Sequence, residues 1–305
     1  MMRRIASAFL LLGATAALAL HGPAPILAQG AAPGFAASLG DVRSLAARIP
    51  GRRPVRINVL KFAESRRTKN FSVKGAAAEP SVQARTAFQL VFQDGTVMVD
   101  AGMDRQVHAF FGRGVEEPYD AAAAAQLERA LKAARLILVT HEHGDHVAGV
   151  IHTPLATELA PKTMLTRAQA QTLRTAPQMP EIRLSEQDAS RYVIVDYDRY
   201  LPVAPGIVLL EAPGHTPGSQ MVYVALESGR EYLLIGDAAW HMDGVRSMAG
   251  KDVPWLIEDT GAVMAQLTWL NGLARREPDL VIVASHDEDE RLALIRKGAL
   301  GDRFE

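Results

Sequence analysis

The segment 141–146 of the chain, HEHGDH, holds three of its nine histidines and limits the folds that are open to it. It directly follows the apolar run 136–139, which predicts a strand covered on both faces. Residues i and i+2 at a strand end point to the same side, so His141 and His143 can present their imidazoles together. Gly144 permits a sharp turn that brings the next two residues to the same cavity. We therefore expect a metal site where a buried strand ends.

This pattern differs from HExxH, the helical motif of many zinc proteases. Asp145 stands where that motif needs its second histidine, and the spacing is that of a strand rather than a helix. Glu142 should consequently point away from the cavity that its two neighbours face.

Three further side chains of the ligand type follow later predicted strands, each where the strand opens into a loop. They are His215 in EAPGHTPGS, Asp237 in IGDAAW and His286 in VASHDED. The chain has no cysteine, so a metal ion has to be bound by histidine and carboxylate. Five histidines and two aspartates are enough for two metal ions that keep open positions for water.

The rest of the chain predicts strands in two groups, with helices between and around them. The expected strands are 55–62, 87–92, 96–99, 136–139, 193–195, 207–210, 221–224, 232–235 and 280–283, and the clearest helices are 121–134 and 261–274. This arrangement favours two packed sheets with helices outside them. The long basic segment 63–85 is too polar for a core, and we expect a mobile loop there, either a solvated hairpin tip or a lid over a site.

The N-terminus predicts export. MMRR precedes a largely apolar run over 5–20 and the small-residue exit Ile26-Leu27-Ala28, as in a secretory signal peptide over residues 1–28. The run is shorter than the roughly 20 residues that span a bilayer, which favours cleavage over a lasting anchor. We expect a flexible tether or a short edge helix over 29–53, one domain over 54–305, and a periplasmic or secreted protein that meets the membrane only through its signal segment.

Charge and composition indicate the kind of partner. The chain has 305 residues, 48% of them apolar, and can bury a substantial core. Its 33 basic and 34 acidic residues leave a net charge of −1, so no overall field attracts nucleic acid. We expect a small-molecule substrate and no nucleic acid, and the sequence leaves the oligomeric state open.

The motif HxHxDH, followed in order by His215, Asp237 and His286, resembles the metallo-β-lactamase superfamily of hydrolases from about Val55 to the C-terminus. The resemblance implies an α/β fold, an αββα sandwich of two mixed sheets with helices outside and the site at one edge between the sheets. It implies one metal held by His141, His143 and His215, a second held by Asp145, His146 and His286, and Asp237 bridging them. Asp100 in VDAG matches an aspartate that lies behind the ligands in this family; an ordinary turn cap is the alternative.

The ligand set suits two Zn²⁺ ions, although iron, manganese or cobalt can occupy similar sites. A water between two such cations has a pKa of about 7 and, as hydroxide, can attack the carbonyl of a small ester, lactone or amide. Asp145 would be the catalytic residue that orients this nucleophile and moves its proton. Three alternatives stay open: amide hydrolysis of the β-lactamase type, a metal-binding protein of this fold without catalysis, and an oxidoreductase that uses iron.

Among hydrolases of the superfamily, the chain most resembles the N-acyl homoserine lactone lactonases, through GHTPGSQ at 214–220, Asp237 and the pair His286-Asp287. Dedicated β-lactamases often place a cysteine near position 237, which this chain lacks. One departure is Trp240, where the lactonases often carry a tyrosine, because tryptophan donates only through its indole N–H. Candidates for the pocket wall, each equally compatible with ordinary packing, are Trp240, His241, His108, Phe110 and Phe111. Candidates for binding a substrate carboxylate, if their loop covers the site, are Arg66, Arg67 and Lys69.

Overall fold

The computed structural model describes residues 34–305, so the predicted signal segment 1–28 lies outside the described residues. The first sheet has the strand order β1 (Arg56–Thr68), β2 (Pro80–Phe92), β3 (Gly95–Val99), β4 (Leu136–Leu138), β5 (Thr163–Thr166) and β6 (Val193–Val195). The second has the order β11 (Val281–Val283), β10 (Glu231–Leu234), β9 (Gln220–Ala225), β8 (Ile207–Glu211) and β7 (Tyr200–Ala204). Both sheets are mixed: β1 to β3 and β7 to β10 pair antiparallel, and β3 to β6 and β10 with β11 pair parallel.

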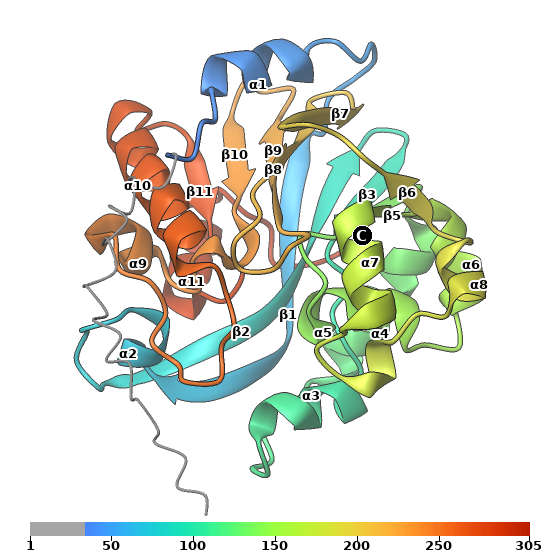
Figure 1. Cartoon of the computed structure of the whole chain (residues 1–305). Coiled ribbons are helices and arrows are strands. Elements are labelled where there is room, and N and C mark those ends of the chain that lie inside the picture. Colours follow the sequence, from blue (N-terminus) through green and yellow to red (C-terminus); the bar gives the residue numbers. More distant parts are fainter. Residues whose placement is uncertain (1–33) are drawn as a thin grey trace, which may run out of the picture. The chain divides into compact units, whose positions relative to one another are not determined.

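The helices lie outside the sheets (Figure 1). On the side of the first sheet these are α3 (Arg105–Gly112), α4 (Ala121–Ala133), α5 (Gly144–Ile151), α6 (Ala156–Leu159), α7 (Arg167–Thr175) and α8 (Glu186–Ala189). The others are α1 (Leu39–Ala46), α2 (Lys69–Ser72), α9 (Met242–Ser247), α10 (Thr260–Arg276) and α11 (Glu288–Arg296), with short 3-10 turns at Ala160–Lys162, Pro180–Ile182 and Gly236–Ala238. Among the described helices, none has the length and apolar content needed to cross a bilayer.

Three apolar clusters hold these layers together, and strand β3 contributes side chains to two of them, one on each face of the first sheet. Val97 and Val99 face the second sheet and pack in a cluster with Val222 and Leu234. Met98, between them, points to the opposite face and packs among the helices that cover the first sheet. Because successive strand residues alternate between faces, a continuous apolar run is what a strand buried on both sides requires. The predicted αββα sandwich is confirmed.

The segment 63–85 differs from the expected loop. β1 and β2 pair along almost their whole length and leave only α2 and the residues up to 79 at the tip. The polar residues that suggested a loop are satisfied inside the protein: Arg67 pairs with Glu117, and Gln83 donates to Ser72 Oγ. Hydrophobic periodicity cannot reveal a strand whose buried side chains are polar and paired, because their partners are distant in the sequence.

The N-terminal segment, for which the sequence predicts a tether or a short edge helix, contains helix α1. Ser38 caps it by accepting from the Asp41 amide, and Val42 is fully buried against the second sheet. The segment is therefore packed from Leu39 onward, because its apolar stripe covers the outer face of β7, β8 and β9.

Helix α5 carries the second half of the HEHGDH segment and is packed unusually close to the exit of β3. A Cβ on Gly149 would lie 2.0 Å from the carbonyl oxygen of Ala101, so only glycine allows this approach. Gly144, expected to make a sharp turn, instead begins the helix, and a Cβ there would lie 2.8 Å from Met179 Cε. Position 144 therefore favours glycine because there is little space for a side chain beside the site, not because of its backbone conformation.

Candidate metal centre

The seven residues predicted as metal ligands come together at one end of the sheets. They are His141 and His143 in the loop after β4, Asp145 and His146 in the first turn of α5, His215 between β8 and β9, Asp237 after β10 and His286 after β11. Six are buried and His143 is half-buried. The elements that bring them together are separate in sequence, but each strand ends at the same edge, as the sequence predicts.

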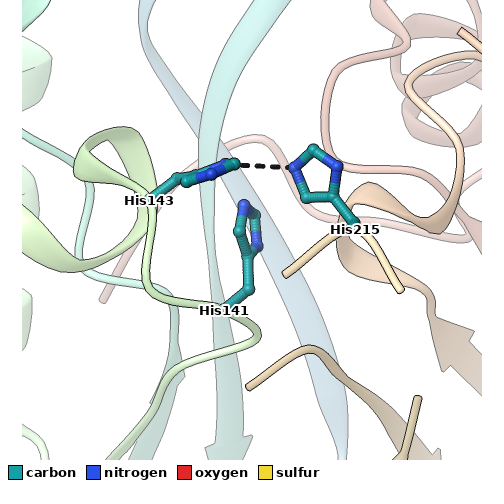
Figure 2. Close-up of side chains that lie close together, drawn as sticks. All are labelled: His141, His143 and His215. Carbon is teal, nitrogen blue, oxygen red and sulfur yellow. Dashed lines mark hydrogen bonds between the residues drawn. The ribbon is translucent and has the colours of Figure 1, made fainter. Parts of the chain in front are cut away.

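His141, His143 and His215 form a first trio, in which the nearest ligand atoms all lie within 4.8 Å of one another. Figure 2 shows the three imidazoles turned toward one another from two separate loops. His215 Nε2 lies 3.0 Å from His143 Nδ1, and the rings of His141 and His143 have their centroids 4.9 Å apart. Three imidazole nitrogens thus face one small volume.

Asp145, His146 and His286 form a second trio within the same 4.8 Å limit. One oxygen of Asp145, Oδ2, lies 3.5 Å from His146 Nε2 and 3.4 Å from His286 Nε2. The two imidazole nitrogens are 3.3 Å apart. This trio therefore presents one carboxylate oxygen and two nitrogens to a second small volume.

Asp237 lies between the trios and approaches imidazoles of both. Its Oδ2 is 3.3 Å from His215 Nε2 and 3.7 Å from His141 Nε2. Its Oδ1 is 3.5 Å from His146 Nε2. His286 Nε2 lies at nearly the same distance from the two oxygens, 3.1 Å from Oδ1 and 3.2 Å from Oδ2. The carboxylate is thus close enough to both trios to bridge two cations.

The donor set fits metal ions. Within residues 34–305, His141 Nε2 and Asp237 Oδ1 are buried and have no hydrogen-bond partner, a state that a native protein rarely leaves uncompensated. Donors around a tetrahedral zinc ion, with bonds of about 2.0–2.1 Å, lie roughly 3.3 Å from one another. The separations within the cluster scatter around that value, so two zinc-sized cations would satisfy the orphaned atoms.

The protonation states favour metal binding at the first trio. Burial, reinforced by the neighbouring imidazoles, lowers the pKa of His143 to about 3 and holds the pKa of His141 well below its usual range. Both are therefore neutral at pH 7, which is the form in which imidazole binds a metal. Burial opposes ionisation of Asp237, but His286 and His146 outweigh it and hold the pKa of this carboxyl well below its usual range.

The second trio differs, because it carries a proton in the absence of metal. Burial disfavours the charged form of His146, yet Asp145 and Asp100 outweigh it and raise the pKa of His146 well above its usual value. The same interaction with His146, together with Arg85, holds the pKa of Asp145 low in spite of burial. A cation entering this trio has to displace the proton of His146.

Asp100 orients His146 from behind. It is fully buried in a left-handed conformation, with φ at 65°, which few residues other than glycine adopt. Its Oδ1 accepts from the Thr140 amide at 2.8 Å, and its Oδ2 lies 2.8 Å from His146 Nδ1. This contact turns Nε2 of His146 toward the site, as outer carboxylates do around metal-binding histidines.

Glu258 plays the matching part behind His215, and sequence patterns did not indicate it. Its Oε2 lies 3.1 Å from His215 Nδ1 and 3.0 Å from Lys251 Nζ, and Lys251 also donates to the Asp237 carbonyl at 2.7 Å. Both residues belong to the irregular segment between α9 and α10. No motif or periodicity marks such a segment, and only its folding back over the site reveals the role.

We expect Glu258→Gln to weaken metal binding about 10–100-fold, the usual effect of losing an outer carboxylate behind a metal-binding histidine. The amide keeps the shape of the side chain but leaves Lys251 without its counter-charge and His215 without an anionic partner. Competition with a chromophoric chelator measures the affinity. Glu290→Gln, at an acid that pairs with Arg246 on the surface, is the control and should bind zinc like the wild type. Equal zinc affinity in both variants would contradict the role given to Glu258.

Trp240 contacts the site differently from the expected wall position. Its Nε1 donates to Asp237 Oδ2 at 2.6 Å, and its ring stands edge-on to His215 and His286 with centroid distances of 6.3 and 6.4 Å. The indole N–H is therefore engaged with the carboxylate between the trios rather than free for a substrate carbonyl.

The remaining candidates lie outside the cluster. His241 caps α9, its Nδ1 accepting from the Asp243 amide, and lies 3.3 Å from Asp287. His108 is buried beside Tyr119, Phe111 stacks on Arg85, and Phe110 is half exposed. The three basic residues considered for binding a substrate carboxylate each pair with an acid outside the cluster: Arg66 with Glu64, Arg67 with Glu117 and Lys69 with Asp243.

Comparison with known proteins gives one family match and several relatives. The model of the Metallo-beta-lactamase superfamily matches residues 85–286, a span that includes all seven residues of the cluster. An N-acyl homoserine lactonase of a Bacillus species is 28% identical over 160 residues, which are 51% of this chain and 57% of that protein. The N-acyl homoserine lactonase of Bacillus thuringiensis is 25% identical over 158 residues. The chain thus matches little more than half the length of these relatives.

Solved structures with the same fold include further lactonases. A quorum-quenching N-acyl homoserine lactone lactonase superposes with a TM-score of 0.62 at 16% identity, covering 79% of this chain and 95% of that chain. AidC, described as a dizinc quorum-quenching lactonase, superposes with a TM-score of 0.51 at 14% identity, covering 79% of this chain and 92% of that chain. At these identities the likeness shows the shared fold.

Proposed function

Because the chain belongs to the metallo-beta-lactamase superfamily, we propose that it is a dinuclear metal-dependent hydrolase that opens small lactones. The observation that carries the proposal is the position of Asp237, whose carboxylate lies 3.1–3.7 Å from imidazole nitrogens of both buried trios. A single-ion site has no need of such a carboxylate. Zinc suits the imidazole and carboxylate donors, and iron, manganese or cobalt are the alternatives.

When bound, two such ions would polarise a carbonyl oxygen and lower the pKa of a water molecule between them. The first ion would be held by His141, His143 and His215, the second by Asp145, His146 and His286, with Asp237 between them. The chain supplies the rest of the chemistry. Asp145 is ionised at neutral pH and can accept a hydrogen bond from the attacking water, which orients it toward the substrate carbonyl.

The buried surroundings support this assignment. The outer contacts from Asp100 to His146 and from Glu258 to His215 hold the imidazole nitrogens in place before substrate arrives. A preorganised polar site with little water stabilises developing charge better than a flexible one. Such a site can turn over an ester or lactone whose carbonyl reaches the space between the trios.

Two features favour a lactone over a β-lactam as the substrate. The bridging position holds aspartate, and no cysteine occurs anywhere in the chain. The curated relatives that match it are named N-acyl homoserine lactonases. Acyl homoserine lactones are accordingly the first compounds to test. The signal-like segment 1–28 supports export, which would place this activity in the periplasm or outside the cell.

The test is a substrate panel on zinc-reconstituted protein. We expect close to two zinc ions per chain and turnover of acyl homoserine lactones, with slower hydrolysis of aryl esters and little of nitrocefin. Nitrocefin turned over faster than any lactone would favour the β-lactamase alternative. Two bound zinc ions with no hydrolysis of any compound would favour a metal-binding protein without catalysis. Iron as the purified metal, again with no hydrolysis of any compound, would favour an oxidoreductase. Fewer than one tightly bound ion per chain, with no turnover after zinc addition, would refute the proposal.

A further inference from the structure

Arg85, a residue that the proposed chemistry does not use, reaches into the second trio from the middle of β2. Its side chain is almost completely buried, and Nη1 donates to Asp145 Oδ2 at 2.5 Å. The same nitrogen lies 3.5 Å from His286 Nε2. A permanent positive charge therefore touches two of the three side chains of this trio, since the guanidinium group stays protonated in proteins.

Two further contacts hold Arg85 in this position. Nη2 donates to Ser65 Oγ at 3.0 Å, across the β1–β2 pair, and Ser65 is fully buried. The guanidinium group also stacks on the ring of Phe111, with its carbon 4.8 Å from the ring centroid. The side chain consequently cannot swing into solvent without breaking a buried hydrogen bond and a stacking contact.

The atom that Arg85 contacts is the one that a metal ion would need. Asp145 Oδ2 is the oxygen that lies 3.5 Å from His146 Nε2 and 3.4 Å from His286 Nε2. A cation at the centre of the second trio would therefore compete with Nη1 for that oxygen and would be repelled by the guanidinium charge. In the contacts made within residues 34–305, Arg85 touches no member of the first trio.

We propose that Arg85 is an internal cation that makes the two metal positions unequal. The first trio, His141, His143 and His215, fills first and tightly. The second trio, Asp145, His146 and His286, fills second and more weakly, because an entering ion has to displace Arg85 from Asp145. This inference rests on the proposed dinuclear site, but it concerns metal affinity rather than turnover.

Arg85 also has a use when the second position is empty. A buried carboxylate without a cationic partner is costly, and Arg85 provides that partner for Asp145. The protein can thus hold one ion without leaving an uncompensated charge beside it. Removing Arg85 should have opposite effects on the two states: the metal-free protein becomes less stable, and the second ion binds more tightly.

The test is a zinc titration of metal-free protein against a chromophoric chelator, with thermal unfolding of the metal-free form measured in parallel. For the wild type we expect two binding steps whose dissociation constants differ by at least about tenfold, as a charge a few ångströms from the second ion requires. Arg85→Met should tighten the second step by at least about tenfold, leave the first unchanged and lower the melting temperature of the metal-free form. Arg85→Lys, which keeps the charge, should keep the weak second step.

Arg67→Met is the matched control, because Arg67 is a largely buried arginine of the neighbouring strand that pairs with Glu117 and contacts no residue of either trio among the described contacts. It should leave both zinc steps as in the wild type. Two equal steps in the wild type, or an unchanged second step in Arg85→Met, would overturn the inference while leaving the hydrolase proposal intact. Failure of the wild type to bind any zinc would overturn both. If Arg85→Met does not fold without metal, the wild-type and Arg85→Lys titrations still decide, since both must show a weak second step.

Discussion

Asp237→Asn is expected to reduce the bound zinc from two ions to one or fewer and to slow hydrolysis at least about 10²-fold, the loss typical of removing one electrostatic group from an active site. Asparagine has nearly the same shape and keeps an oxygen that can accept from Trp240 Nε1. It removes the negative charge that faces imidazoles of both trios at 3.1–3.7 Å. Metal analysis after dialysis and initial rates on an acyl homoserine lactone measure the two effects.

Asp243→Asn is the control for this prediction. Asp243 lies six positions further along the chain and pairs with Lys69 and Arg246 at the surface. It contacts none of the seven clustered residues among the described ion pairs, and we expect its replacement to leave both zinc content and turnover unchanged. A variant Asp237→Asn that kept two ions and wild-type rates would show that the carboxylate does not bridge a metal pair.

Removal of zinc with a chelator is expected to lower the melting temperature by about 10 °C. A ligand present at 1,000 times its dissociation constant stabilises the native state by about 4 kcal/mol, and each kcal/mol shifts the melting temperature of a domain of this size class by about 2–4 °C. The physical source is the cluster itself, where buried polar atoms such as His141 Nε2 lose the cation that would satisfy them.

Scanning calorimetry with and without chelator measures this shift, and zinc added back in excess should restore the original melting temperature. Asp237→Asn provides the internal control, because a protein that holds fewer ions has less stability to lose on chelation. An unchanged melting temperature in the wild type would mean that metal binding is not coupled to folding in this chain, contrary to the buried geometry of the donors.

Local sequence patterns were sufficient for most of the fold. The strands expected over 96–99 and 136–139 are β3 and β4, and the helix expected over 121–134 is α4, which begins where the Asp120 side chain accepts from the amides of Ala122 and Ala123. These features depend on interactions between residues close together in the chain, so a short segment of the sequence is enough to predict them. The prediction of a loop over 63–85 was wrong because the contacts that bury its polar side chains are not local: the partners of Arg67 and Arg85 lie 50 and 60 positions away in the sequence.

The seven clustered side chains were identifiable from the sequence because each follows a strand. Histidines and aspartates gathered so closely after strand ends are typical of metal ligands. The residues that support them were not identifiable: Glu258, Lys251 and Arg85 carry common charged side chains in an irregular loop and a polar strand. Trp240 could be placed near the site by its distance from Asp237 along the chain, but not assigned its hydrogen bond to that carboxylate.

The amino-acid sequence alone thus determined the layers of the fold and the identity of the clustered histidines and aspartates, because periodicity and residue type are local properties. Only the tertiary structure decided which charges surround that cluster. The pairing of Arg85 with Asp145 and of Glu258 with His215 depends on segments brought together by the packing of two sheets, and burial makes such contacts between charged groups stronger than they would be at the surface.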